Sequence, residues 1–478
     1  MAKSSEVTVE QCLELLEKMV ELIKSEDDRL FARVKRKNGN PVLVPIESVN
    51  FMDCLRIIMN DGFKKLLNKS QIKELQEHAA ALARSKSIKE KIFIRYRRGK
   101  TKTVIDLADE LGRAVLIAAD GVKILEAPKT YFYQPKGQLP LEEFKRCKII
   151  DGFKKLRKYI KNVSFNDFRL IISWMVDVIY SNGPYPILIL QGEQGSAKTF
   201  IMKALRSIFD PVKSPVRSLP QGERDFIIMA NNSVVLPFDN VSYLKPWMPD
   251  AFCRIASGGG YSSRKLYTDD DEMYFNLCRP FIMNGIPDFV TKNDMADRVI
   301  MIMMESISDA ERKTEEELWN EFQIDKPYIL GALYEAVRMV ITNIDNVKIE
   351  KLPRMADFAK IACAVAPGLK WTEQEFLEAY NENRRITSTA CLDADEVALA
   401  VLDYVKDENE WVGPALMLLQ ELTAKNPESA KKRYWPTTPS KLSNRLRTAA
   451  PGLRKNGVEV VFSRSGKNRK IKLKYTGS

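Results

Sequence analysis

A glycine-rich octapeptide that follows an apolar run constrains this chain more than any other segment. Residues 185–191 read YPILILQ, residues 192–199 read GEQGSAKT, and a helical pattern covers residues 200–209. A continuous apolar run of this length is typical of a buried parallel strand. We therefore expect an α/β core in which a loop joins a buried strand to a helix.

The octapeptide has the composition of a phosphate-binding loop. Backbone amides of such a loop enclose phosphates together with the start of the next helix, Lys198 would neutralise the outer phosphates, and the Thr199 hydroxyl would ligate magnesium. Ala197 stands where the usual pattern has glycine, and its methyl group is tolerable if the backbone keeps right-handed angles there. The predicted ATP contacts are Gly192, Glu193, Gln194, Gly195, Ser196, Ala197, Lys198 and Thr199.

Two later apolar runs end in polar residues that suit the same site. Residues 234–239 end at Asp239, whose carboxylate is expected to hold magnesium. Asn240 follows where ATPases of this kind usually have glutamate, and an amide can orient water but cannot take its proton. The next run ends at Asn284, either a holder of the attacking water or a turn residue before Gly285.

Two arginines are candidates for contacts with nucleotide from further away. Arg298 could reach ATP bound to a neighbouring subunit and stabilise transition-state charge, or it could form a local surface pair with Asp297. Arg354 is a candidate second sensor in a helical lid, with a helix-start residue beside Asp357 as the alternative.

As an ordered set, these motifs resemble a known family. The three glycines at 258–260, the run Arg264, Lys265, Leu266, Tyr267 and the strand ending at Asn284 are similar to the hairpin and polar sensor of superfamily 3 AAA+ helicases. The similarity is to the poxvirus-type replicative helicases of phages and mobile elements, including the minichromosome-maintenance-like helicases of staphylococcal islands. It covers residues 164 to 478.

The resemblance implies a ring, commonly a hexamer, with ATP between subunits and the hairpin in a central channel. Arg264 and Lys265 would contact a DNA strand there, and Tyr267 would stack on a base. The acidic run at residues 268–272 departs from this use, since it would repel phosphate at the channel centre.

The patterns divide the chain into four units. Residues 1–140 read as an N-terminal α+β domain that serves as a collar or engages DNA, with strands at 31–36 and 42–46 and a meander within 91–126. Residues 141–310 would form the AAA+ phosphate-loop core, beginning with a basic helix at 141–161. Residues 311–390 would form its helical lid. Residues 391–478 have three helices and a hairpin, the order of a winged helix.

The C-terminal unit carries candidate DNA contacts. Ser440, Asn444 and Arg447 would lie on one face of its third helix and enter a major groove, whereas Arg464, Lys467 and Arg469 in the wing would meet phosphates. An ordinary solvated charged tail is the alternative.

A second basic stretch surrounds Tyr96. It contains Arg95, Arg97, Arg98, Lys100 and Lys102. This stretch could track a nucleic-acid strand, but a solvated hairpin edge protected by charge is the favoured interpretation.

Composition limits the remaining function classes. Lys and Arg number 75 against 63 Asp and Glu, a balance that suits nucleic-acid binding and equally a soluble basic surface. Seven widely spaced cysteines, with no C-x-x-C pair, indicate a reduced cytoplasmic chain without structural zinc. The single histidine, His78, has no acid–base or metal partners nearby and is expected on a helix surface. No signal peptide and no membrane span are expected.

The sequence therefore predicts an ATP- and magnesium-dependent DNA helicase that replicates a phage or mobile element. Its expected partners are single-stranded and duplex DNA, further copies of the chain, and a separate primase or initiator. One alternative is an AAA+ ATPase that remodels a protein or nucleoprotein complex without unwinding. Another is a DNA-binding replication initiator that nucleotide only switches, as Asn240 suggests.

Overall fold

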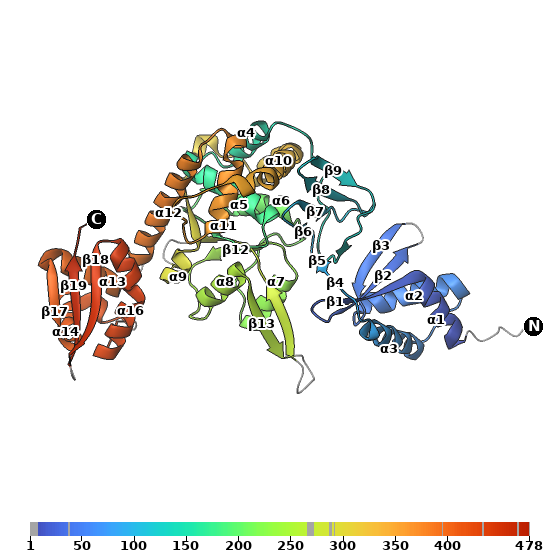
Figure 1. The fold of residues 1–478 in the computed structure, drawn as a ribbon, viewed down its shortest axis with the longest axis horizontal. Helices are drawn as coiled ribbons and strands as arrows, with labels where there is room; N and C mark the ends of the chain where they lie inside the picture. Colours follow the sequence, from blue (N-terminus) through green and yellow to red (C-terminus); the bar gives the residue numbers. More distant parts are fainter. Residues whose placement is uncertain are drawn as a thin grey trace, which may run out of the picture.

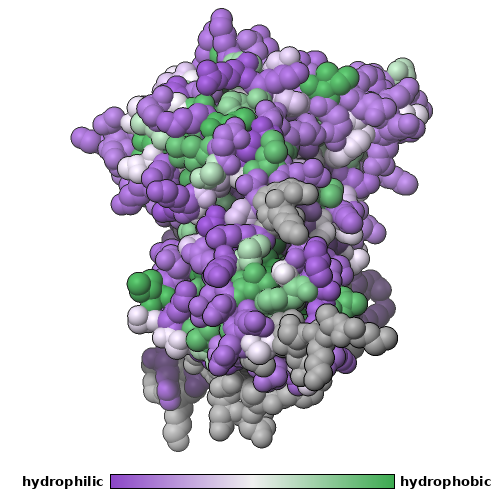
Figure 2. Space-filling view, turned by 90° about the vertical axis from the view of Figure 1, so that its right-hand side faces the viewer, coloured by the Kyte–Doolittle hydropathy of each residue, from purple (hydrophilic) through white to green (hydrophobic). Residues whose placement is uncertain are grey.

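The computed structural model is a mixed α/β protein with several sheets (Figure 1). It describes residues 8–36, 39–264, 272–285, 289–290, 292–393, 395–432, 435–465 and 468–477. Figure 1 shows an N-terminal domain and a C-terminal domain at opposite ends of a larger central body. The face seen from the N-terminal side is mostly hydrophilic, with hydrophobic residues in small groups (Figure 2). Among the residues that the structure describes, every helix is too short or too polar to span a lipid bilayer.

The N-terminal domain packs helices against a small sheet of order β3-β2-β1-β4. The predicted hairpin is confirmed as β2 (Leu30–Arg36) and β3 (Gly39–Pro45). Helix α1 (Val9–Met19) leads into β1 (Val20–Ser25), which pairs with β2. The domain is completed by α2 (Val49–Phe63), α3 (Lys69–Ser85) and β4 (Lys89–Glu90). His78 is exposed on α3, as predicted.

The predicted meander is confirmed as a four-stranded antiparallel sheet in chain order. Its strands are β6 (Tyr96–Arg98), β7 (Lys102–Asp106), β8 (Ala114–Ala118) and β9 (Gly121–Leu125). Arg95 has a φ of 57°, which separates β6 from the short strand β5 (Ile92–Phe93). β5 pairs instead with β10 (Tyr131–Phe132).

The interpretation of the basic stretch as a solvated edge is wrong for two of its residues. Arg95 is fully buried, and its Nε lies 3.1 Å from Asp210 Oδ1. Tyr96 is also buried and donates a 2.7 Å hydrogen bond to the carbonyl of Phe209. Both side chains hold the meander against the central body, because the carboxylate that pairs with Arg95 lies 115 residues along the chain.

The basic helix expected over residues 141–161 is shorter than predicted, since only α4 (Ile149–Tyr159) is helical. In the preceding segment the amide of Leu141 donates to the carbonyl of Leu107, and that of Lys145 donates to Pro327. These tertiary hydrogen bonds take the place of helical ones.

A parallel sheet of order β12-β15-β11-β16 forms the centre of the molecule. Its strands are β11 (Ile187–Gly192), β12 (Leu236–Val241), β15 (Phe281–Gly285) and β16 (Val299–Met304). Ile187 to Leu190 are fully buried, as expected of a strand covered on both faces. The surrounding helices are α5 (Phe165–Tyr180), α6 (Lys198–Phe209), α7 (Glu223–Asn231), α8 (Met248–Ser257) and α9 (Asn293–Ala296).

A hairpin and three longer helices complete the central body. Strands β13 (Gly259–Arg264) and β14 (Glu272–Leu277) pair antiparallel. The helical region after β16 contains α10 (Glu315–Asn343), α11 (Ala356–Val365) and α12 (Glu373–Asp393). A short 3₁₀ turn over Ala366–Leu369, which contains a proline and a glycine, separates α11 from α12.

The C-terminal domain has its own core. The three expected helices are present as α13 (Glu396–Glu408), α14 (Ala415–Lys425) and α16 (Pro439–Lys455), with the short α15 (Pro427–Ala430) between the last two. The expected hairpin is β18 (Val458–Ser465) with β19 (Asn468–Tyr475). Sequence patterns did not identify β17 (Glu410–Gly413), which pairs with β19.

Candidate functional site

The glycine-rich loop joins the carboxyl end of β11 to α6, where two glycines lie in close contacts. A Cβ on Gly192 would come within 2.3 Å of the carbonyl oxygen of Met304. Gly195 has a φ of 86°, and a Cβ there would lie 2.9 Å from the guanidinium of Arg312. Asn162 links the loop to the residue that follows β16. Its side-chain amide donates to the carbonyls of Ser196 (3.1 Å) and Glu305 (2.7 Å).

Ala197 does not have the right-handed backbone angles that would make its methyl group tolerable. Its backbone is left-handed, with φ 59° and ψ 23°, in the position that precedes helix α6. An alanine in this region carries strain of roughly 1–2 kcal/mol relative to right-handed angles, because its Cβ approaches the following carbonyl. This is the conformation that the usual glycine adopts without strain, so the departure from the pattern has an energetic consequence.

The ammonium group of Lys198 lies within the loop. Its Nζ donates to the carbonyls of Gly192 (2.8 Å) and Glu193 (2.6 Å) and to Ser196 Oγ (3.0 Å). Desolvation lowers the pKa of Lys198, and the nearby Asp239 carboxylate opposes that shift. A positive charge is thus held at the start of a helix, where the backbone amides also favour an anion.

Thr199, Asp239 and Asn284 converge beside this lysine although they come from three segments. The Thr199 hydroxyl donates a 3.0 Å hydrogen bond to Asp239 Oδ1, and the Asn284 amide lies 3.4 Å from the same hydroxyl oxygen. Asn284 is buried within β15, between β11 and β12, so the structure places it in a strand and not in a turn.

Asn240 lies at an irregularity of β12. The register with β15 shifts between Phe238 and Val241, and Asn240 has a φ of 55°. Its backbone amide donates a 2.6 Å hydrogen bond to Asn284 Oδ1, while the residue itself is exposed. A bulge of this kind changes the direction of neighbouring side chains, here Asp239 and Asn240.

The donor set next to the loop suits a magnesium ion. A hydroxyl and a carboxylate lie 3.0 Å apart, and Mg²⁺ prefers oxygen ligands, one or two carboxylates and several waters or phosphate oxygens. Within the described ranges, no group of three or more His, Cys, Asp or Glu residues could hold a metal ion. All seven cysteines are free thiols in the structure.

Arg298 and Arg354 meet each other at Asp294 and not at the loop. Arg298 pairs with Asp294, and the Nη2 of Arg354 lies 2.6 Å from Asp294 Oδ1. Asp297, the expected partner of Arg298, pairs instead with Lys455 of α16. Arg298 precedes β16, whereas the loop follows β11, and the register aligns Ile187 with Val299 and Gly192 with Met304. Arg298 and the glycine-rich loop therefore lie at opposite ends of these strands. At about 3.3 Å per residue, roughly 20 Å separates them.

The candidate DNA contacts of the C-terminal domain are exposed. Ser440, Asn444 and Arg447 lie on α16, where the Arg447 guanidinium covers the ring of Phe462 at 4.0 Å. Arg464 and Arg469 face each other across the β18–β19 hairpin and are also exposed. Lys467 lies outside the described residues.

The three residues predicted to line a channel are placed only in part. Arg264 ends β13, and nothing is described of its side chain. Lys265 and Tyr267 lie outside the described residues.

Sequence reasoning did not identify Asn162 or Arg312 as neighbours of the loop. Asn162 precedes α5, and Arg312 lies between β16 and α10, so both are remote from the glycine-rich motif in the chain. Neither stands in a recognisable motif, and only their tertiary contacts identify them.

Comparisons with known proteins link the chain to mobile-element replication. Residues 154–382 match the model of the "Actinomycete integrative conjugative element replication protein" family, and residues 397–478 match that of the "AICE RepA C-terminal domain". No curated protein matches the chain.

Similar solved structures include two of one protein. The A form apo structure of the NrS-1 C terminal region is 14% identical, with 97% of this chain and 98% of that chain covered and a TM-score of 0.43. Another apo structure of that region is 11% identical, with 98% of each chain covered and a TM-score of 0.42.

Proposed function

We propose that this replication protein of a mobile element is a ring-forming, ATP-dependent DNA helicase. The observation that carries the proposal is the hydrogen bond between Thr199 and Asp239 beside Lys198. Three side chains from two separate segments supply what a magnesium–nucleotide complex requires, namely a hydroxyl, a carboxylate and a cation.

In this proposal the loop residues bind and orient the ATP phosphates. Lys198 exchanges its carbonyl partners for phosphate oxygens, and the amides at the start of α6 donate to the same anion. Thr199 and Asp239 hold magnesium, which when bound neutralises charge on the phosphates. Because phosphoryl transfer depends chiefly on positioning and charge stabilisation, these contacts account for most of the expected rate.

Water activation is the weaker part of the proposed site. The side-chain nitrogen of Asn284 faces Thr199, and the side-chain oxygen of Asn284 accepts a hydrogen bond from the backbone amide of Asn240. Neither asparagine can accept a proton at neutral pH, so both orient a water molecule without deprotonating it. We expect turnover to be slow for this reason.

The DNA-binding part rests on the C-terminal domain. Exposed polar and basic residues on α16 and on the β18–β19 hairpin provide base-edge and phosphate contacts to duplex DNA. The hairpin formed by β13 and β14 would hold a single DNA strand in the channel of the ring. A separate primase or initiator completes the replication machinery.

Asn240 favours one second candidate function. An asparagine in place of the usual glutamate suits a site that binds nucleotide and changes assembly without rapid hydrolysis. In that case the protein is a nucleotide-switched DNA-binding initiator.

An ATPase and strand-separation assay tests the proposal, with and without single-stranded DNA. We expect DNA-stimulated hydrolysis and unwinding that Lys198→Ala abolishes. Lys203→Ala is the matched control, because it removes another lysine of α6 whose partner is Glu315. Hydrolysis without unwinding favours a remodelling ATPase, and nucleotide binding without turnover favours the initiator. Each of these outcomes contradicts the helicase proposal.

A further inference from the structure

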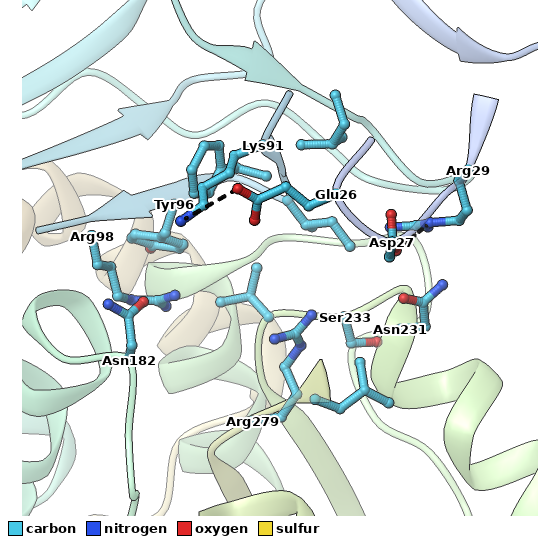
Figure 3. Close-up of a pocket in the computed structure, with 15 residues that line it drawn as sticks. Glu26, Asp27, Arg29, Lys91, Tyr96, Arg98, Asn182, Asn231, Ser233 and Arg279 are labelled. Atoms are coloured by element: carbon cyan, nitrogen blue, oxygen red, sulfur yellow. Dashed lines mark hydrogen bonds and ion pairs between the residues drawn. The ribbon is translucent and has the colours of Figure 1, made fainter. Parts of the chain in front are cut away.

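A cleft of about 500 Å³ lies where the N-terminal domain, the meander and the central body meet (Figure 3). Its walls are formed by some of the residues in segments 26–29, 91–98, 231–234 and 277–279. Residue 234 precedes β12 and residue 279 precedes β15, whereas the glycine-rich loop follows the opposite, carboxyl end of the sheet. The cleft is therefore separate from the proposed ATP site.

Two guanidinium groups of the cleft donate to backbone carbonyls, and that of Arg98 also lies over the ring of Tyr96, 4.7 Å from its centroid. Arg98 donates from Nε and Nη2 to the carbonyl of Val178, at 3.0 and 2.9 Å. Arg279 donates to the carbonyls of Ala230 (3.0 Å) and Cys278 (2.9 Å). A carbonyl orients a guanidinium but does not neutralise it, and the ion pairs found among the described residues include neither arginine. Both remain available for an anion.

The carboxylates that line the cleft are already paired with other cations. Glu26 lies 3.7 Å from Lys91, and Asp27 lies 2.6 Å from Arg29. The buried Asp177 also interacts with Arg98, but burial raises the pKa of its carboxyl to about 7, so it offsets that charge only in part. The cleft consequently carries net positive charge.

A buried hydroxyl also lines the cleft. Ser233 is 0% exposed, and its Oγ has no hydrogen-bond partner among the residues that the structure describes. Figure 3 shows Ser233 next to Asn231 and the guanidinium of Arg279. An unsatisfied buried hydroxyl is unfavourable unless a ligand or water satisfies it, so its position points to a polar ligand.

We propose that this cleft binds a nucleoside phosphate, either free or as one nucleotide of a DNA strand. Arg98 and Arg279 hold the phosphate, and the Ser233 hydroxyl donates to it. The amides of Asn182 and Asn231, which also line the cleft, face the sugar or base. The volume suits this ligand, since small-molecule sites commonly measure about 300–1,000 Å³ and a phosphate ion alone would leave most of the space unfilled.

The test measures ligand binding to the full chain that carries Lys198→Ala. This substitution removes the lysine of the proposed ATP loop. The probes are ADP, a ten-nucleotide oligothymidylate with a photoreactive base, and inorganic phosphate, each followed by titration. We expect ADP or the oligonucleotide to bind and Arg279→Gln to weaken that binding at least about tenfold, as expected for a charged hydrogen bond. Saturation by ADP assigns a free nucleotide. Crosslinks of the oligonucleotide to residues 91–98 or 277–279 assign a DNA strand.

Ser233→Ala keeps the test decisive if an arginine variant fails to fold, because its hydroxyl makes no hydrogen bond within the described part of the chain. We expect it to weaken the same binding several-fold, whereas Arg56→Gln on the exposed surface of α2 leaves it unchanged. The proposal is overturned if neither nucleotide probe binds, if phosphate alone binds, or if binding is insensitive to both Arg279→Gln and Ser233→Ala. These outcomes do not depend on ATP hydrolysis, so they are distinguishable from failure of the helicase proposal.

Discussion

The side-chain carbonyl of Asn284 accepts a 2.6 Å hydrogen bond from the backbone amide of Asn240. This bond links β15, an inner strand of the parallel sheet, to the irregularity of β12 between Phe238 and Val241. It fixes the orientation of the Asn284 amide, whose nitrogen then faces the Thr199 hydroxyl. One buried amide thus connects three segments of the proposed ATP site.

Asn284→Ala is expected to lower ATP turnover at least about tenfold, because loss of the amide leaves the backbone N–H of Asn240 unpaired and removes the contact with the Thr199 hydroxyl. Steady-state ATPase assays measure the effect. Asn383→Ala is the control, since Asn383 is also a buried amide and bonds the backbone of Met301 away from the loop. An equal loss of turnover in both variants would indicate a general loss of stability and not a role at the site.

Ala197→Gly is expected to stabilise the protein by about 1 kcal/mol, because glycine adopts the left-handed conformation of residue 197 without strain. Ala204→Gly serves as the opposite control. Ala204 is buried in the interior of α6, where glycine costs about 1 kcal/mol or more. Urea unfolding measures the change in the free energy of unfolding, which should rise for Ala197→Gly and fall for Ala204→Gly. Destabilisation by Ala197→Gly would contradict the strain assigned to this residue.

Arg298 is expected to act on the nucleotide of a neighbouring subunit, because it lies at the sheet edge opposite its own loop. Arg298→Ala and Lys198→Ala should each be nearly inactive alone. An equimolar mixture should regain measurable ATP turnover, since some interfaces then combine an intact loop with an intact arginine. Full activity of Arg298→Ala by itself, or no recovery on mixing, argues against a contribution in trans.

Asp177 gives the stability a defined pH dependence. It is 1% exposed, and burial raises the pKa of its carboxyl from 3.8 to about 7. The folded protein therefore retains a proton that the unfolded chain releases, so the free energy of unfolding falls as the pH rises between these values. Asp177→Asn should be more stable than the parent at pH 8, by roughly 2–4 kcal/mol, with little difference near pH 4.

Urea unfolding at pH 4, 6 and 8 measures this difference. Asp403→Asn, on the exposed face of α13, is the control and should not change the pH profile. A gain that is the same at all three pH values would mean that ionisation of Asp177 is not its cause.

Arg464 and Arg469 face each other across the C-terminal hairpin, so we expect both to meet DNA phosphates. The double variant Arg464→Gln, Arg469→Gln should weaken duplex binding and reduce the slope of log K against log salt by up to about two. Fluorescence anisotropy over a salt series measures the slope. Arg56→Gln with Arg385→Gln removes the same charge from α2 and α12, and an equal change there would indicate a non-specific effect.

The sequence by itself determined the local part of this protein. Apolar runs and glycine positions predicted β11, the loop, α6, the meander and the three C-terminal helices, because strand and helix periods and turn residues are local properties of a chain. The pairing of Thr199 with Asp239 also followed from the expectation that parallel strands end at one edge of a sheet.

Only the tertiary structure decided the rest. It placed Ala197 in left-handed angles, brought Arg298 and Arg354 together on Asp294, and buried Arg95 against Asp210. The pairs Arg95–Asp210 and Arg354–Asp294 depend on partners far away in the chain, whose positions no local pattern encodes. A guanidinium is solvated or buried according to whether a distant carboxylate or carbonyl reaches it, and that is settled only when the domains pack.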